Sequence, residues 1–205
     1  ITPDGQREWW YSNFTYVPSS IDIGKDGYIY YCDWVGDIFK LDKDRNLQNS
    51  FSLPIESMAR ALKVDVNGNI YVGNSSDINN VYKFDNQGNL IWTFTEVTDS
   101  IDEIVLDLES NVYISSRDNN AYKLDSNGNK LWKFTGTSDW CYTISVDKNK
   151  NVCVGSIDGY IYKIDDNLTP TDGSSFSNYE WRDKPSPYNH WTEEIVSSAG
   201  TIKFW

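Results

Sequence analysis

Seven side chains of this sequence are of the types that often contact another molecule, and they fall where we expect loops or the beginnings of strands. Trp, Tyr and Arg are the usual energetic anchors of protein interfaces. The candidates are Trp34, Arg60, Asp102, Arg117, Trp140, Tyr142 and Glu193. These residue types predict binding rather than a reaction. For Trp34 and Trp140 the alternative is that the rings simply pack between structural elements.

A catalytic group is hard to find in this sequence. His190 is the single histidine, so a Ser-His-Asp triad could be built only through it. It lies in a stretch, 185–191, that matches none of the repeated segments described below. The chain also lacks a glycine-rich phosphate loop of the G-x-x-x-x-G-K-[ST] type. We therefore predict no catalytic residues, no cofactor and no enzyme activity.

Two short stretches resemble the start of a calcium-binding loop. They have the pattern Asp-x-Asn-Gly-Asn and occupy residues 65–69 and 125–129. A complete EF-hand loop needs a bidentate Glu at its twelfth position, where this chain has Ser76 and Gly136. Tight hairpin turns use the same residue types. We therefore predict turns and no metal site.

Most of the chain repeats at intervals of about forty residues. Four segments align, Tyr28–Asp42, Ile70–Asp85, Val112–Asp125 and Val152–Asp165. Each contains two short alternating runs rich in Tyr, Val and Ile, which is typical of β-strands. Asp, Asn and Gly lie between the runs and favour hairpin turns. Each repeat is therefore expected to form four short antiparallel strands, A to D.

Repeated four-stranded units of this length predict a β-propeller, because stacking around an axis covers both apolar faces of each small sheet. We expect one domain over residues 1–205, with five blades or an arc of a larger ring, and the chain to be a piece of a longer polypeptide. The expected blades cover 17–53, 58–96, 100–136 and 140–184, the last with an insertion at 167–180 that could cover an edge. Residues 1–16 would supply a D strand, and 190–205 strands A and B of a further blade.

The loops at one face of such a propeller, B–C and D–A, differ more among the repeats than the turns at the other face. Five residues take equivalent places before strand A ends, namely Ser19, Arg60, Asp102, Tyr142 and Glu193. We expect them to line the mouth of the central channel. Variable loops on a rigid scaffold are where binding residues concentrate.

The repeats resemble the PQQ-like repeats of bacterial propellers, which are WD40-like in architecture. The resemblance rests on 158–165, with the sequence Asp-Gly-Tyr-Ile-Tyr-Lys-Ile-Asp, and on Tyr122–Asp125 followed by Asn127–Phe134. It implies that one tryptophan in each blade packs against the next blade. That role would fall to Trp9, Trp92, Trp132 and Trp181, with Asn49 replacing the ring in the first complete repeat.

The enzymes of that family are quinone-dependent dehydrogenases with a vicinal disulfide and a bound calcium. This chain has no adjacent cysteines, so the resemblance favours a non-enzymatic member. Cys141 and Cys153 would lie on neighbouring strands about four positions out of register, too far apart for a disulfide. With Cys32, they are expected to be small core residues.

The net charge of −12 argues against nucleic acid or an anionic membrane as the main partner. No apolar run is long enough for a transmembrane helix, so no membrane insertion is expected. We predict a binding or scaffold module for a protein partner or a larger assembly. One alternative is a glycan-binding, receptor-binding or structural module of a bacterial surface protein or a phage virion protein. An extracellular, cell-surface or virion location is therefore slightly favoured over the cytoplasm. A second and less favoured alternative is an enzyme with a site in the central channel.

Overall fold

The computed structural model describes residues 15–75, 78–183, 195–197 and 200–202. These residues form β-strands joined by turns and loops, with one 3-10 turn, η1, at Asp166–Leu168. The prediction of an all-β chain built from four-stranded antiparallel units is confirmed. Residues 1–14 and 184–194, with the strand residue expected at Trp9, the loop residue His190 and the candidate Glu193, lie outside the described residues.

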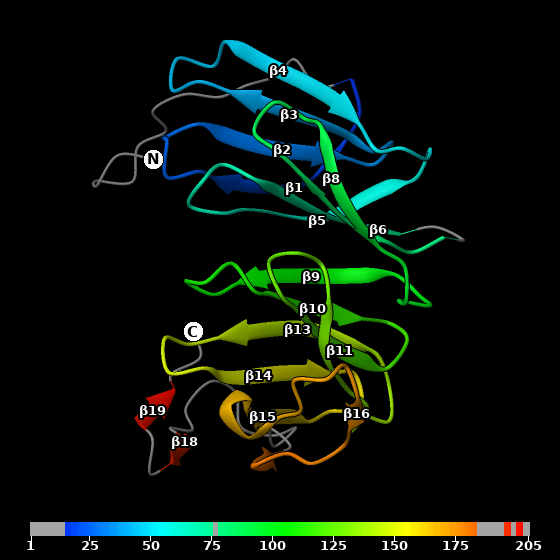
Figure 1. Cartoon of the computed structure of the whole chain (residues 1–205), viewed down its shortest axis with the longest axis vertical. Helices are drawn as coiled ribbons and strands as arrows, with labels where there is room; N and C mark the ends of the chain where they lie inside the picture. Colours follow the sequence, from blue (N-terminus) through cyan, green and yellow to red (C-terminus); the bar gives the residue numbers. More distant parts are fainter. Residues whose placement is uncertain (1–14, 76–77, 184–194, 198–199, 203–205) are drawn as a thin grey trace.

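Four sheets follow one another in chain order along the long axis of the molecule (Figure 1). Sheet 1 contains β1 (Pro18–Ile23), β2 (Ile29–Asp33), β3 (Asp37–Leu41) and β4 (Leu47–Ser52). Sheet 2 contains β5 (Met58–Val64), β6 (Ile70–Ser75), β7 (Val81–Phe84) and β8 (Leu90–Phe94). Sheet 3 contains β9 (Ile101–Leu106), β10 (Val112–Ser116), β11 (Asn120–Leu124), β12 (Lys130–Phe134) and β16 (Ser175–Phe176). Sheet 4 contains β13 (Cys141–Val146), β14 (Asn151–Ser156), β15 (Ile161–Asp165) and β17 (Trp181–Asp183). A separate hairpin pairs β18 (Ile195–Ser197) with β19 (Gly200–Ile202).

One turn design recurs along one edge of the sheets. In the turn that begins at Asp65, one carboxylate oxygen accepts the backbone N–H groups of Asn67 and Asn69, at 2.8 and 2.9 Å. The other oxygen accepts the side-chain amide of Asn69 at 2.7 Å. The turns at Asp42, Asp85, Asp107, Asp125 and Asp147 make the same three contacts. The aspartates therefore serve the turn itself. Among the described residues, no group of three or more His, Cys, Asp or Glu side chains is placed to hold a metal ion.

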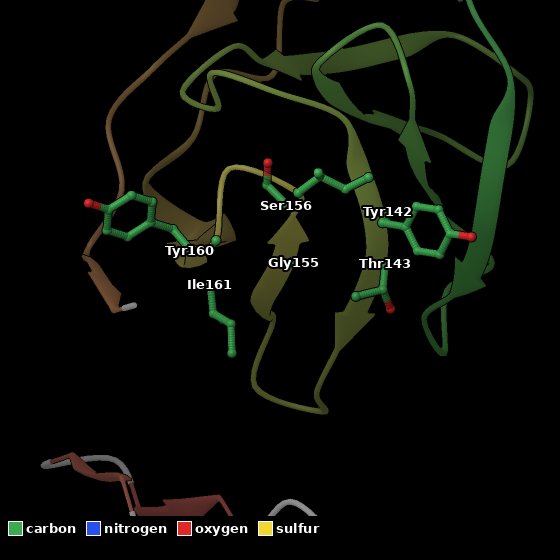
Figure 2. A pocket seen from close by; sticks show the side chains of 8 residues that line it. Tyr142, Thr143, Gly155, Ser156, Tyr160 and Ile161 are labelled. Carbon is green, nitrogen blue, oxygen red and sulfur yellow. The ribbon is translucent and has the colours of Figure 1, made fainter. Parts of the chain in front are cut away.

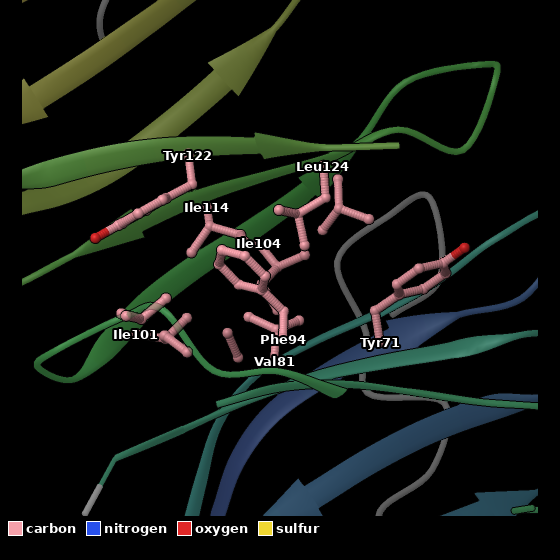
Figure 3. Packing of buried hydrophobic residues seen from close by; sticks show 11 residues of the cluster. Tyr71, Val81, Phe94, Ile101, Ile104, Ile114, Tyr122 and Leu124 are labelled. Carbon is pink, nitrogen blue, oxygen red and sulfur yellow. The ribbon is translucent and has the colours of Figure 1, made fainter. Parts of the chain in front are cut away.

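Neighbouring sheets pack through apolar clusters that both sheets share. Figure 3 shows Tyr71, Val81 and Phe94 of sheet 2 against side chains of sheet 3 that include Ile101 and Ile104. The Ile101 side chain packs directly on the backbone of Gly73, where an added Cβ would lie 3.0 Å from the Cβ of Ile101. Similar clusters join sheets 1 and 2 and sheets 3 and 4. Each sheet thus buries an apolar face that it could not cover alone.

The first strands of the four sheets, β1, β5, β9 and β13, lie side by side in chain order. Side chains of one first strand bind backbone N–H groups of the next. Leu62 N donates to Ser20 Oγ at 3.2 Å, and Val64 N donates to Asp22 Oδ2 at 2.9 Å. Ile144 N donates to Glu103 Oε2 at 2.9 Å. These bonds satisfy N–H groups that a sheet edge would otherwise leave unpaired.

The insertion in the fourth repeat joins two sheets. One expectation for 167–180 was that it covers an edge, and Ser175 and Phe176 do pair in parallel with Lys133 and Phe134 at the outer edge of sheet 3. The Phe176 ring packs at 5.5 Å from the ring of Trp132. The chain then returns to sheet 4 as β17. Covering an exposed strand edge in this way removes a site of unwanted pairing.

The residues expected to dock one unit on the next occupy one register position, opposite a lysine in each sheet. Trp92 donates its indole N–H to Ser126 O of sheet 3 at 3.2 Å and lies against Gly128. Trp132 is buried and donates to Asp166 at 2.6 Å. Asn49, which replaces the ring in sheet 1, donates its side-chain amide to Gln87 O at 2.8 Å. The backbone of Trp181 pairs with Lys163 in β15.

The three cysteines are free. Cys141 pairs with Ser156, while Cys153 pairs with Ser145, so the predicted offset of about four positions is confirmed. Burial raises the pKa of the Cys32 thiol to about 11 and that of Cys141 to about 12. These thiols are therefore protonated near neutral pH.

Candidate functional site

The first strand of each of sheets 1 to 4 contains a β-bulge at the same place. In β5, Ala59 pairs with Asn74 and Ala61 with Gly73, which leaves Arg60 as the extra residue. The extra residues of the four first strands are Ser19, Arg60, Asp102 and Tyr142. A bulge re-aims the side chain of the extra residue and often lies beside a functional site. The bulge in each backbone thus explains why these four residues, which the sequence aligned, occupy equivalent positions.

Two arginines hold the carboxylate of Asp102 from two neighbouring sheets. Arg60 Nε of sheet 2 lies 2.5 Å from Asp102 Oδ1. Arg117, which directly follows β10, donates Nε to Oδ2 at 2.9 Å and Nη2 to Oδ1 at 3.2 Å. The Asp102 side chain is only 3% exposed, whereas those of Arg60 and Arg117 are 27% and 22% exposed. The hydrogen bond to Asp102 raises the pKa of Arg117 above its ordinary value.

Two aromatic rings of the next sheet lie beside this ion cluster. The Arg117 guanidinium carbon is 4.8 Å from the ring centre of Trp140 and 5.7 Å from that of Tyr142. A guanidinium at this distance from an aromatic ring is attracted to its π-face. Trp140 is 38% exposed and Tyr142 49% exposed, so both rings retain surface for another molecule. We call Arg60, Asp102, Arg117, Trp140 and Tyr142 the recognition cluster.

The other candidates behave differently. Trp34 is 54% exposed and lines a hollow of about 650 Å³ with residues that include Leu53, Glu56 and Met58. This hollow contains no member of the recognition cluster. The Ser19 hydroxyl lies 2.5 Å from Ala59 O and 3.2 Å from Cys32 O, so it links sheets 1 and 2. Of the seven predicted binding residues, the structure therefore brings five together, separates Trp34 and does not describe Glu193.

A second hollow, of about 400 Å³, adjoins the recognition cluster at Tyr142 on sheet 4 (Figure 2). In the figure, Tyr142 and Tyr160 lie on opposite sides of the strand that carries Gly155 and Ser156. Gly155 holds the register position that Gly73 holds in sheet 2, since each pairs with the residue directly after a bulge. At Gly73 that position is covered by the following sheet.

Sequence reasoning missed two acidic residues. Glu103, next to the bulged Asp102, accepts the Thr143 hydroxyl at 2.5 Å and so joins sheets 3 and 4. Asp166 is buried and accepts hydrogen bonds from Trp132, Tyr113 and Lys123. The available signal was the pair Asp165-Asp166, where the equivalent turns continue with Lys43, Asn86 or Ser126.

The recognition cluster combines charged and aromatic groups. Its ionic groups are two guanidiniums and a carboxylate, and it contains no Ser, Thr or Cys nucleophile beside a base. Arg can bind a carboxylate or phosphate through two parallel hydrogen bonds. The aromatic rings add apolar contact area that also tolerates polar neighbours.

No protein-family model matches this chain, and no curated protein is significantly similar to it.

Across the residues that the structure describes, we find no helix with the length and apolar character needed to cross a membrane.

Proposed function

We propose that this chain is a non-catalytic binding module that recognises a protein partner through the recognition cluster. The observation that carries the proposal is the cluster's position. Residues from three consecutive sheets meet beside the bulges of the first strands, where a shared carboxylate fixes the arginines and two aromatic rings remain partly exposed. Exposed Trp, Tyr and Arg on a rigid support are typical anchors of protein interfaces.

We also propose that the sheets are blades of a β-propeller of the PQQ-like type. The side-by-side first strands and the repeated contacts between sheets support this arrangement. The hollow at Gly155 would then receive a fifth blade that includes residues 190–205. Hydrogen exchange can test this, because Ile195–Ile202 should be protected in the wild type and lose protection in a Gly155→Arg variant. Unprotected amides in the wild type would count against a fifth blade.

The binding proposal can be tested without knowing the natural partner. A random peptide library is selected on the wild-type chain, and the affinity of the selected peptides is measured by calorimetry. Combining Arg60→Ala with Trp140→Ala should weaken binding about tenfold or more, since anchor residues carry most interface energy. The control is Trp34→Ala, which removes an exposed ring outside the cluster. Equal affinity for wild type and double variant would overturn the proposal.

Glycan recognition is the second candidate, and the exposed rings of Trp140 and Tyr142 are the observation that favours it. Aromatic faces can stack on the apolar faces of sugar rings. A glycan array probed with the wild type and with Trp140→Ala separates the candidates. Signals that depend on Trp140 would favour glycans, whereas an array without signal above background would remove this reading.

A further inference from the structure

Arg60 has hydrogen-bonding capacity that the described structure does not use. Its Nε contacts Asp102, and no described residue accepts a hydrogen bond from either of its terminal amino groups. Arg117, by contrast, uses both Nε and Nη2 on the same carboxylate. Because the Arg60 side chain is 27% exposed, another molecule can approach it from solvent.

The guanidinium of Arg60 is held in place before any ligand arrives. Its backbone lies at the bulge of β5, and its Nε is bound to an aspartate that is only 3% exposed. Ordering a long side chain usually costs conformational entropy on binding. Because Asp102 already orders the Arg60 side chain, less conformational entropy is lost when a ligand binds. Each new hydrogen bond to Arg60 would therefore contribute more to the free energy of binding.

Charge and shape favour an anionic group with an apolar neighbour. Two guanidiniums bind the Asp102 carboxylate, and Asp99 also acts electrostatically on Arg117, so Arg60 is the less neutralised cation in a chain whose net charge is −12. Beside it, the half-exposed rings of Trp140 and Tyr142 offer apolar surface. A peptide segment in which an acidic residue lies next to a large apolar one matches both features.

We propose that Arg60 binds a carboxylate of the protein partner, while Trp140 and Tyr142 contact an apolar side chain next to that carboxylate. This inference rests on the proposed function and names its ligand chemistry. The carboxylate could belong to Asp or Glu or to a chain terminus. Both present two oxygens to the donors of one guanidinium.

The test is a double-mutant cycle on peptides selected against the wild type. Each peptide is prepared with its acidic residues intact or replaced by Asn and Gln, and with a free or amidated C-terminus. Removing the contacting carboxylate should weaken binding to the wild type about tenfold or more, the usual scale for a charge-assisted hydrogen bond. The same change should alter affinity for Arg60→Gln less than about twofold, because the two partners are coupled. Arg45→Gln, which makes the same charge change at the turn edge, is the control and should behave as wild type.

Each outcome decides a different question. Peptides that need Trp140 but tolerate loss of every carboxylate would overturn this inference and leave the proposed function standing. Peptides indifferent to all cluster substitutions would overturn the proposed function itself. Sensitivity to the acidic side chains or to C-terminal amidation identifies the source of the carboxylate. Binding of acidic glycans with no selected peptide would also overturn the inference.

Discussion

Two buried carboxylates join neighbouring sheets, and they differ in how their cations meet solvent. Asp166 follows β15 in sheet 4 and binds Lys123, Tyr113 and Trp132 of sheet 3. Its side chain is 1% exposed and that of Lys123 is 9% exposed. Asp102 of sheet 3 is buried almost as deeply, at 3%, but its arginines are 27% and 22% exposed.

This difference separates a structural role from one that can also serve recognition. The Lys123, Tyr113 and Trp132 side chains that bind Asp166 are buried between sheets 3 and 4, and the part-buried Thr169 hydroxyl also donates to its Oδ1 at 3.2 Å. The Lys123 ammonium is therefore shielded from solvent. At Asp102 the carboxylate is buried and the cations are accessible. The same kind of pair can therefore stabilise the sheet junction and hold a guanidinium ready for a ligand.

The largest effect is expected at the buried ion pair of Asp166 and Lys123, which we call the closed pair. Asp166→Ala would leave the Lys123 ammonium and the Trp132 indole N–H buried without their acceptor, while the Tyr113 hydroxyl would keep only Asp107. Removing one partner of a buried pair usually costs about 3 to 5 kcal/mol. Urea unfolding should show this loss, while Asp44→Ala, which removes an exposed aspartate, should change the free energy of unfolding by less than about 0.5 kcal/mol. If Asp166→Ala lowers the free energy of unfolding by less than about 1 kcal/mol, the closed pair does not have the structural role that separates it from Asp102.

A smaller loss of stability is expected at Asp102 and its two partly exposed arginines, Arg60 and Arg117, which we call the open pair. Asp102→Asn keeps the shape and removes the charge, and water can solvate both arginines once they are released. We expect a loss of about 1 to 2 kcal/mol, below the range for a closed pair because solvent screens the exposed cations. The same substitution should also weaken peptide binding, because the Asp102 carboxylate no longer holds the Arg60 guanidinium in place. We expect this loss of affinity to be larger than the loss of stability. If Asp102→Asn lowers the free energy of unfolding as much as Asp166→Ala does, then exposure of the cations does not distinguish a purely structural ion pair from one that also serves recognition.

The sequence pointed to Arg60, Asp102 and Arg117 as candidate binding residues, without their ion pairs, but not to Asp166, and the difference has a physical reason. Arg60, Asp102 and Tyr142 occupy one repeated position, so the repeat alone aligns them, and bulges at that position turn the alignment into proximity. Asp166 breaks the repeat, and its burial depends on Trp132 and Lys123 of another sheet. The parallel pairing of Ser175–Phe176 with β12 is likewise non-local. The sequence repeat predicts features that all the sheets share. Contacts made by residues without a counterpart in the other repeats can be seen only in the folded structure.

The smallest effect is expected in the pH dependence of stability, and it also distinguishes the closed pair. Burial alone would raise the pKa of Asp166, but hydrogen bonds from Lys123, Trp132 and Tyr113 outweigh burial and hold the pKa below its ordinary value. A carboxyl whose pKa is lower in the folded state stabilises the fold above its unfolded pKa of about 3.9. This contribution is lost as the pH falls through the lower folded pKa. The wild type should therefore lose stability steeply below about pH 4.

Asp166→Asn cannot titrate, so its free energy of unfolding should fall less steeply over the same acidic range. The turn aspartates will keep part of the slope in both proteins, because hydrogen bonds from Asn46 and Asn89 also hold the pKa values of Asp42 and Asp85 below their ordinary range. The informative quantity is thus the difference between the two slopes, measured by urea unfolding at several acidic pH values. Identical slopes would show that the closed pair does not contribute to acid sensitivity, and that its hydrogen bonds survive protonation of Asp166.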